Sequence, residues 1–535
     1  MKKRDSFLKG VLLLTAAGVI VKLLGFIYRV ILTNLPGYGD EGNGIYGAGF
    51  QVYLVLYALS TTGFPAAIAK LVAEKTARRD WQGAHRVFKV SFWVLFSTGI
   101  IFSLLFFTCS KHIAMLISNP RTVYTMIAIS PAIFFVSIMA VYRGYFQGLQ
   151  DMSPQAYSQI IEQLGKTIST IGLAWFLMPY GSEIAAAGAT FGTSIGAAIG
   201  AVYLWNLYNR KKAEIWMKIR KSRIRKKEDS AAKIIKNLIK IAFPISMGAV
   251  ILTIANIIDL GTVMLQLKRA GFSSSNANEL YGILTGKCYV LTHFPVSITI
   301  ALATSLVPAI AGAMAVGDYK AAAVKISASL RLTVLISLPA SAGMAILAEP
   351  ILNMLFPASS EGAVLLALSS STIIFIGLTQ TLSGILQGLG KVYVPAVSLF
   401  MGAVAKLLIN YILIPVPSIN VKGAVYGTLV CYIISTLICM AALVKNFKLN
   451  LNLYNFIIKP VLATIVMGFG TYYTYYWISD VAGSSSIGTI ASIAVSVFLF
   501  GMLILVMGGV SKNDVSALPF GKNVGRALNR TGLMR

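Results

Sequence analysis

Long apolar runs recur through this 535-residue chain, and most are about as long as a bilayer is thick. Lipid offers no partner to an unpaired backbone group, so runs of this length are expected to be membrane-crossing helices. The pattern predicts an all-α polytopic membrane protein with about fourteen spans. The expected spans are residues 7–33, 45–72, 87–108, 122–147, 157–177, 184–207, 234–265, 281–314, 325–347, 363–387, 393–414, 423–443, 456–477 and 487–507.

The composition agrees with a chain whose solvent is lipid. Hydrophobic residues make up 56% of it, charged residues 12%, and the mean hydropathy is +0.75, more apolar surface than a soluble domain could bury. The formal net charge is +28, but the basic side chains are scattered between apolar runs, so nucleic acid is not an expected partner. The 3 histidines are far apart, so neither a metal site nor a cofactor is expected; an unidentified coupling cation stays open.

Basic residues are unevenly divided between alternate loops. One loop carries Lys75 and Arg78, and another is the strongly basic stretch 210–233, whereas the opposite loops are poor in Lys and Arg and include Glu41 and Glu183. The positive-inside rule therefore predicts a multi-pass plasma-membrane protein with both termini in the cytoplasm. The basic stretch either attracts anionic lipid headgroups or an anionic substrate, or is a topology determinant alone.

The chain also contains an internal repeat. Pairs of short segments match in the same order along its two halves: residues 144–149 with 384–389, Lys166 with Lys406, residues 188–193 with 423–428, and residues 46–47 with 281–282. Six spans separate the copies, so both have one orientation in the bilayer, as parallel repeats do. The repeated glycines also permit close helix packing. Gln147 and Gln387 in the repeat, and Gly25 in the first span, are candidates for gating or packing.

This repeat predicts two pseudo-symmetric six-helix lobes plus two C-terminal helices. We expect an N-terminal lobe over residues 1–208, a basic cytoplasmic linker over 209–233 and a C-terminal lobe over 234–447. The last two spans lie within residues 448–510, and a cytoplasmic tail follows over 511–535.

Ionisable side chains inside a span are costly unless they face protein or a water-filled cavity, so they mark candidate sites. In the first span, Lys22 and Arg29 are seven residues apart and share one helical stripe with Gly18 and Gly25. A stripe that faces a cavity explains this pattern, although Arg29 is near enough to the outer interface to reach the headgroups.

Other ionisable residues are weaker candidates. Asp259 lies at a comparable depth in the first span of the second lobe, where it could pair with Lys22 or hold a coupling ion. Lys287 and His293 could line the outer half of one cavity. Glu162 and a lysine four residues later are spaced to neutralise each other on a helix.

The sequence gives no sign of an enzyme. Residues 37–42 fit the GxGxxG pattern of dinucleotide-binding proteins, but no strand precedes them, and we expect a flexible connector between two spans. A P-loop, a nucleophile elbow and a large external domain are all missing from the sequence. Direct ATP hydrolysis and other catalysis are therefore not expected.

Two segments carry a resemblance to a known family. Residues 22–29 (KLLGFIYR) resemble the cationic first-helix motif of the MurJ lipid II flippases in the MOP superfamily of multidrug and oligosaccharidyl-lipid exporters. Residues 294–308 look like the eighth helix of the same family, and the span count extends the similarity over nearly the whole chain. The chain is most similar to the branch of stage V sporulation protein B and YtgP-like polysaccharide biosynthesis proteins.

The resemblance implies a transport function. It implies export of an undecaprenyl-diphosphate-linked saccharide, with lipid II favoured, from the inner to the outer leaflet by alternating access. Lys22, Arg29 and Lys287 would then attract the diphosphate, and the last two spans would hold the polyprenyl tail. The expected partners are this substrate and membrane lipids, with cell-wall synthesis proteins as candidates.

Several alternatives stay open at this point. The cargo could be a teichoic acid, capsule or spore-envelope intermediate, because each carries the same diphosphate lipid. A cation-coupled multidrug antiporter of the same superfamily is a further alternative, but it would need acidic residues in its spans.

Overall fold

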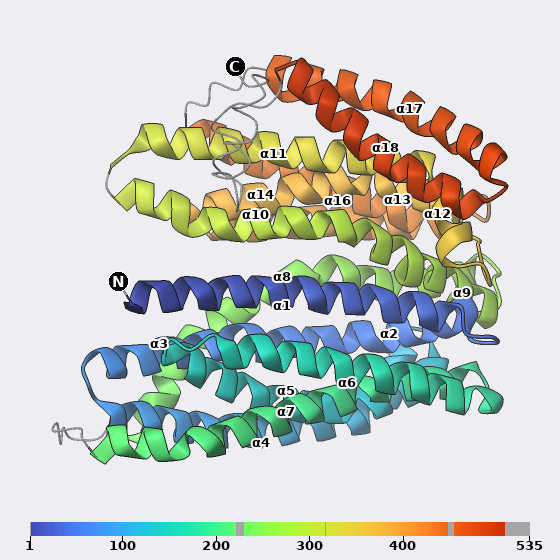
Figure 1. Cartoon of the computed structure of the whole chain (residues 1–535). Coiled ribbons are helices and arrows are strands. Elements are labelled where there is room, and N and C mark those ends of the chain that lie inside the picture. The colour runs from blue at the N-terminus through green and yellow to red at the C-terminus, as the bar shows by residue number, and fades with distance from the viewer. Residues whose placement is uncertain (1, 221–228, 316, 448–453, 509–535) are drawn as a thin grey trace. The chain divides into compact units, whose positions relative to one another are not determined.

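The structure is a computed structural model that describes residues 2–220, 229–315, 317–447 and 454–508 (Figure 1). Over these residues it is built from helices, with no strand, so the all-α prediction is confirmed. Among the described helices, 11 are long and apolar enough to cross a membrane. Helices also cover the other expected spans, and the total of about fourteen remains a prediction. The expected tail, residues 511–535, lies outside the described residues, as do residues 221–228 of the linker.

The chain divides into two compact units. Unit 1 contains Met1–Leu265 and Ser273–Gly282, and unit 2 contains Gln266–Phe272 and Ile283–Arg535. The first unit therefore takes in most of α8 and all of α9, which we assigned to the second lobe, and the lobe limits remain a prediction. The helices of unit 1 are α1 (Lys2–Thr33), α2 (Gly39–Ala58), α3 (Phe64–Ala77), α4 (Trp81–Leu116), α5 (Val123–Gly148), α6 (Ser153–Leu177), α7 (Ser182–Arg220), most of α8 (Ala231–Arg269) and α9 (Ser274–Gly282).

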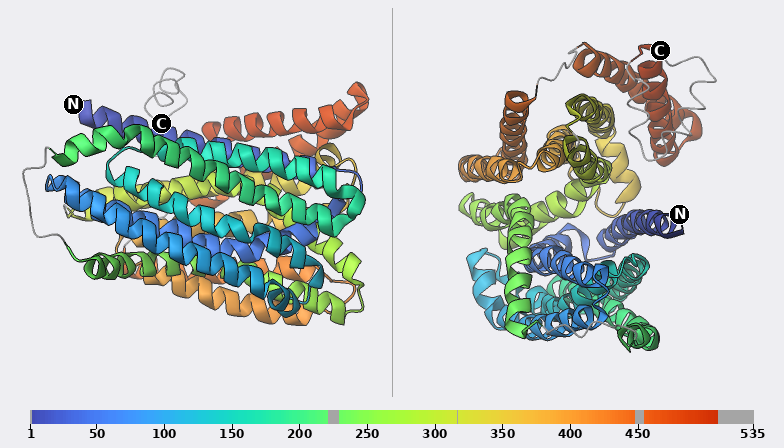
Figure 2. Two further views of the ribbon diagram at one scale, coloured as in Figure 1. Left: turned by 90° about the horizontal axis from the view of Figure 1, so that it is seen from below. Right: turned by 90° about the vertical axis from the view of Figure 1, so that its left-hand side faces the viewer.

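Unit 2 is a second bundle, with its last two helices at the edge (Figure 2). Its helices are α10 (Tyr289–Ala315), α11 (Tyr319–Ile346), α12 (Ala348–Leu355), α13 (Ala363–Ser370), α14 (Thr372–Gly388), α15 (Tyr393–Leu413), α16 (Lys422–Asn446), α17 (Lys459–Ala482) and α18 (Ser485–Val506). Helices α17 and α18 form a hairpin that packs on α11, where Leu335, Met467 and Phe500 share one buried cluster.

Side-chain caps fix where several helices begin. Asp80 accepts a hydrogen bond from the Gly83 backbone N–H at 2.7 Å before α4, and Asp318 accepts one from Ala321 at 2.9 Å before α11. The first N–H groups of a helix have no partner within the helix, so such caps stabilise its start.

The described residues include three short π-helical segments, which are η1 (Leu59–Gly63), η4 (Ile283–Cys288) and η5 (Tyr454–Ile458). At η1 the wider turn is supported from α8, because the Ser246 hydroxyl donates to the Leu59 carbonyl at 2.9 Å. Gly63 permits this approach, since a Cβ there would lie 2.2 Å from the Ala242 carbonyl oxygen. π-Helical turns often occur at functional sites.

The repeated glycines pack in the same way in both units. Gly144 and Gly148 of α5 lie against the backbone of α3, and Gly384 and Gly388 of α14 lie against the backbone of α10. A Cβ at any of the four would come within 3.0 Å of the facing helix, which confirms the close packing predicted for these positions.

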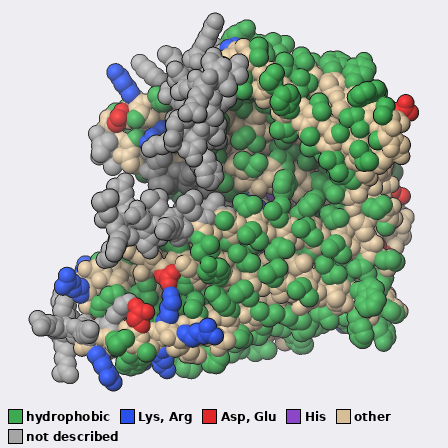
Figure 3. Space-filling view, in the orientation of Figure 1, with side chains coloured by type: hydrophobic (Ala, Val, Ile, Leu, Met, Phe, Trp, Pro, Cys, Tyr) green, Lys and Arg blue, Asp and Glu red, His purple; other side chains and the backbone are tan. Residues whose placement is uncertain are grey.

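The exposed side chains also follow the sequence pattern. On the face shown in Figure 3, hydrophobic side chains cover the middle, and Lys and Arg side chains gather toward one end. Exposed apolar side chains such as Trp93, Phe102 and Phe107 on α4 suit lipid contact.

Candidate substrate-binding sites

Arg29 lies in the interior of unit 1, near the end of α1. Only 8% of the residue is exposed, its Nη1 donates to the Asn43 side-chain oxygen at 3.2 Å, and its guanidinium lies 4.3 Å from the centre of the Tyr46 ring. Asn43 in turn donates to the Thr33 hydroxyl at 2.7 Å. The side chain is therefore held by α2 and enclosed within unit 1.

Lys166 lies beside this group on α6. Its ammonium is 4.3 Å from the centre of the Phe50 ring and 5.3 Å from that of Tyr28. The expected neutralisation by Glu162 is wrong, because that carboxylate pairs with Arg143 at 2.8 Å. Side chains four residues apart on one helix face can be drawn in different directions when neighbouring helices offer better partners.

Lys22 and Gly25 occupy the rest of the α1 stripe. Gly25 faces α6, but a Cβ there would lie 3.8 Å from the Gln163 amide, an ordinary contact distance, so the helix packing does not require glycine at this position. Lys22 is exposed and forms no ion pair with any residue that the structure describes, so the expected pairing with Asp259 is not formed. Asp259 is buried in α8, with 1% exposed.

Lys287 belongs to unit 2 and lies in the π-helical segment η4. It is fully buried, and its ammonium donates to the Ser359 backbone carbonyl, to the Ser359 hydroxyl at 3.2 Å and to the Glu361 carbonyl at 3.4 Å. The loop between α12 and α13 therefore encloses this cation. His293 is exposed and its Nδ1 is 2.7 Å from the Tyr289 carbonyl, so the two residues lie in different environments.

The repeat glutamines end their helices alike. The Gln147 carbonyl accepts from the Gln150 backbone at 2.9 Å, and the Gln387 carbonyl accepts from Gly390 at 3.0 Å. Gln147 is half-buried and Gln387 is exposed. A gating or packing role for these side chains remains a prediction.

A polar network on unit 1 was not foreseen from the sequence. Arg121 pairs with Glu41 and, at 2.6 Å, with Glu183, and Glu41 also accepts from the Ser275 hydroxyl of α9. The predicted flexible connector is wrong in part, because Gly39 to Gly42 form the first turn of α2. The opposite charges in these loops were the available signal, but sequence does not show which loops meet.

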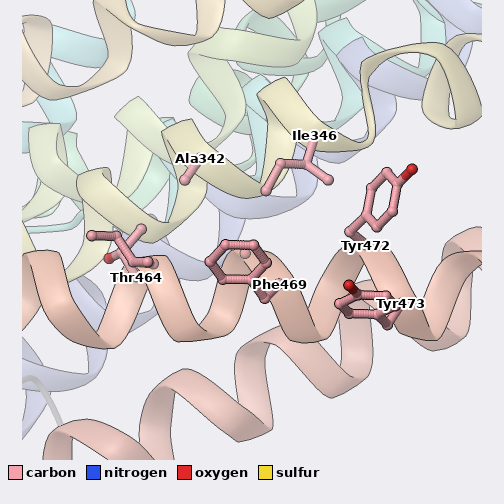
Figure 4. A pocket seen from close by; sticks show the side chains of 8 residues that line it. Ala342, Ile346, Thr464, Phe469, Tyr472 and Tyr473 are labelled. Atoms are coloured by element: carbon pink, nitrogen blue, oxygen red, sulfur yellow. The ribbon is translucent and has the colours of Figure 1, made fainter.

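An apolar groove lies between α11 and α17 (Figure 4). Its volume is about 460 Å³, and its lining residues are Ala342, Ile346, Thr464, Ile465, Gly468, Phe469, Tyr472 and Tyr473. The tail groove was predicted for the last two spans, and α17 lines this one together with α11. Such a groove suits a hydrocarbon chain better than a polar ligand.

The helices, the cations buried inside the bundles and the apolar groove define a multi-pass membrane transporter. The family model described as polysaccharide biosynthesis protein matches residues 7–314, and the MatE model matches residues 287–412. The chain belongs to the polysaccharide biosynthesis protein family, within the MOP superfamily of flippases and transporters. This confirms the resemblance, and the family consists of transporters, not catalytic enzymes.

Known relatives are similar along most of the chain. Stage V sporulation protein B of Bacillus subtilis (strain 168) is 28% identical over 98% of this chain and 100% of its own length. Lipid II flippase MurJ of the same organism is 27% identical over 81% of each chain. A solved structure of lipid II flippase MurJ in an inward closed conformation matches with a TM-score of 0.68 and 16% identity, covering 93% of this chain and 98% of that one. An inward-facing multidrug resistance MATE transporter matches with a TM-score of 0.65 and 15% identity, over 80% and 96% of the two chains.

Proposed function

We propose that this protein moves an undecaprenyl-diphosphate-linked saccharide from the inner to the outer leaflet of the plasma membrane, and that the favoured cargo is lipid II. The observation that carries the proposal is Arg29, a permanently charged side chain buried in a span without an acidic partner among the described residues. A buried cation of this kind is costly unless an anionic ligand uses it. A relative named as a lipid II flippase agrees with this cargo.

The proposed roles follow from where the side chains lie. Lys22 and Arg29 attract the diphosphate from α1, and Lys287 does so once phosphate oxygens replace the carbonyls of Ser359 and Glu361. Asp259 and His293 are candidates for cavity charge or ion coupling. The groove between α11 and α17 takes part of the polyprenyl tail.

Transport by alternating access requires two states that differ by a few kcal/mol, so that cargo or an ion can shift their populations. We propose that both termini lie in the cytoplasm, as the basic loops indicate. Cell-wall synthesis proteins are proposed partners on that side.

A second candidate is a spore-envelope cargo, favoured by the similarity to stage V sporulation protein B over nearly the full length of both chains. A multidrug antiporter is a third candidate: Glu162 is neutralised by Arg143, which counts against it, but Asp259 is a second carboxylate buried in a span. An antiporter would need a free carboxylate in its spans.

The test is depletion of the protein in a host that lacks redundant flippases, followed by addition of an external toxin that cleaves lipid II. Cleavage should fall while total lipid II accumulates, and Arg29→Ala should not restore it. Unchanged cleavage would exclude lipid II and leave the spore-envelope cargo as the leading candidate.

A further inference from the structure

Two cations in unit 1 are held in the same unusual way. Arg29 lies on the face of Tyr46, and Lys166 lies on the faces of Phe50 and Tyr28. Within the described parts of the chain, neither forms an ion pair with a carboxylate. Arg143, another buried cation of this unit, is instead paired with the Glu162 carboxylate at 2.8 Å.

The aromatic rings join the two cations into one cluster. Tyr46 and Phe50 stack with their ring centres 5.5 Å apart and at an angle of 18°, and the hydroxyls of Tyr28 and Tyr46 are 3.3 Å apart. Three helices, α1, α2 and α6, therefore bring both positive charges to one set of rings.

Three polar groups on α2, α6 and α7 also have no hydrogen-bond partner in the described part of the chain. The Thr167 and Thr193 hydroxyls and the Gln51 side-chain nitrogen are enclosed and have no hydrogen-bond partner among the described residues. Both threonines are at least nine-tenths buried. α7 crosses α6 at Lys166, because a Cβ on Gly196 would lie 2.7 Å from the Lys166 backbone nitrogen. Buried polar groups without partners call for a physical explanation, and Thr167 and Gln51 directly follow the cluster residues Lys166 and Phe50 in the sequence.

Lys166 lies in the middle part of α6, about 20 Å along the helix from Ser153, and Arg29 lies about 6 Å from the C-terminal end of α1. A ring face offsets only part of the cost of a cation in this environment. A ligand with anionic oxygens would supply the missing negative charge.

We propose that Arg29 and Lys166 form a binding site, inside unit 1, for one anionic group of the phosphate class. The lysine offers three donors and the arginine a planar fork, which together suit a tetrahedral oxyanion. The group has two sources: the diphosphate of the lipid-linked cargo, which rests on the proposed function, or a free inorganic phosphate.

The test is calorimetric binding of inorganic diphosphate to the full-length protein in detergent at fixed ionic strength. Lys166→Met should weaken binding about tenfold or more, and Lys166→Arg should restore most of it. Lys211→Met is the matched control: this lysine of unit 1 also lies over a ring, 5.5 Å from that of Phe146, but it has the Asp151 carboxylate at 2.5 Å. Binding to the control should not change.

The proposed site would be overturned if Lys166→Met bound diphosphate as tightly as the wild-type protein does. It would also be overturned if Lys211→Met lost as much affinity as Lys166→Met. If Lys166 had only a structural role, Lys166→Met would lower the thermal midpoint of unfolding and leave the diphosphate affinity of the folded protein unchanged. Thr193→Val, which removes one hydroxyl, gives a second measurement should Lys166→Met fail to fold, and unchanged binding there would also count against the site.

Transport of lipid-linked saccharide in proteoliposomes separates the two sources. Loss of transport together with binding in Lys166→Met assigns the site to the cargo, and loss of binding alone assigns it to a free anion. A wild-type protein that binds diphosphate but moves no lipid-linked saccharide would refute the proposed function and leave the site standing.

Discussion

Alanine at Gly44 or Gly282 should undock α9 from α2. The two helices touch through backbone at these glycines: a Cβ on Gly44 would lie 1.9 Å from the Asn278 carbonyl oxygen, and one on Gly282 would lie 1.8 Å from that of Asp40. Ordinary contact begins at 3.4 Å, so the helices would have to separate by about 1.5 Å. No side chain can rotate away, because both obstacles are backbone. We therefore expect either substitution to destabilise the docked state of α9 by about 3 kcal/mol, in the upper part of the range for overpacking.

The assay is labelling of a single cysteine at position 278 by a water-soluble thiol reagent, after the native cysteines are replaced. Asn278 is fully buried, so the label enters only when α9 undocks. A change of about 3 kcal/mol corresponds to roughly a hundredfold in the docking equilibrium, which should appear as much faster labelling. Gly172→Ala is the control, because a Cβ there would meet nothing within 4 Å. Equal labelling rates in all variants would refute the reasoning.

Three further predictions concern ion pairs and the groove. Glu162→Gln should destabilise unit 1 by about 3 kcal/mol, because it leaves the Arg143 guanidinium buried without its carboxylate. In thermal unfolding, the double variant with Arg143→Met should recover part of this loss. Equal losses of stability in the single and double variants would argue against coupling. Hydrogen bonds from Lys233 and then Lys75 lower the pKa of Asp229 to about 2, so its stabilising effect is present above about pH 4 and is lost as pH falls toward 2. Melting curves of Asp229→Asn and the wild-type protein should therefore converge over that window, and a constant difference would contradict it. Gly468→Leu should fill the groove and lower cargo transport, and the end of the Ile346 side chain, 3.1 Å from a Cβ at this position, would have to shift. Full transport would remove the groove from the tail path.

The helical membrane fold could be predicted from the sequence because each span carries its own signal. A run of about 20 apolar residues has one stable solution in lipid, whatever its neighbours are. The repeat could be predicted for a similar reason. The backbone of a neighbouring helix packs against Gly144 and Gly384, so both positions need a small residue and the two copies match in sequence. The π-helical segments were not readable, since η1 depends on Ser246, a residue far away in the sequence.

The candidate site could be predicted only as a list of buried charges. Spacing on one helix placed Lys22 and Arg29 on a shared stripe, but only Arg29 is enclosed, because Asn43 and Tyr46 of α2 face it. The partner predicted for Glu162 was wrong for the same reason, because the residue that pairs with it, Arg143, lies on another helix. Which charges share a site depends on contacts between helices, and the sequence pattern of one helix does not contain them.

Charge placement also bears on how such a protein can bind a phosphate and still release it. A cation paired with a carboxylate gains little from an anionic ligand, because the ligand must first displace the acid. Arg29 and Lys166 rest on rings instead, and a ring face attracts a cation weakly enough for an oxyanion to replace it. Lys287 differs, because carbonyl groups of one loop hold it. Ligand binding at Lys287 would therefore be coupled to movement of that loop, whereas binding at the ring-held pair would not require one.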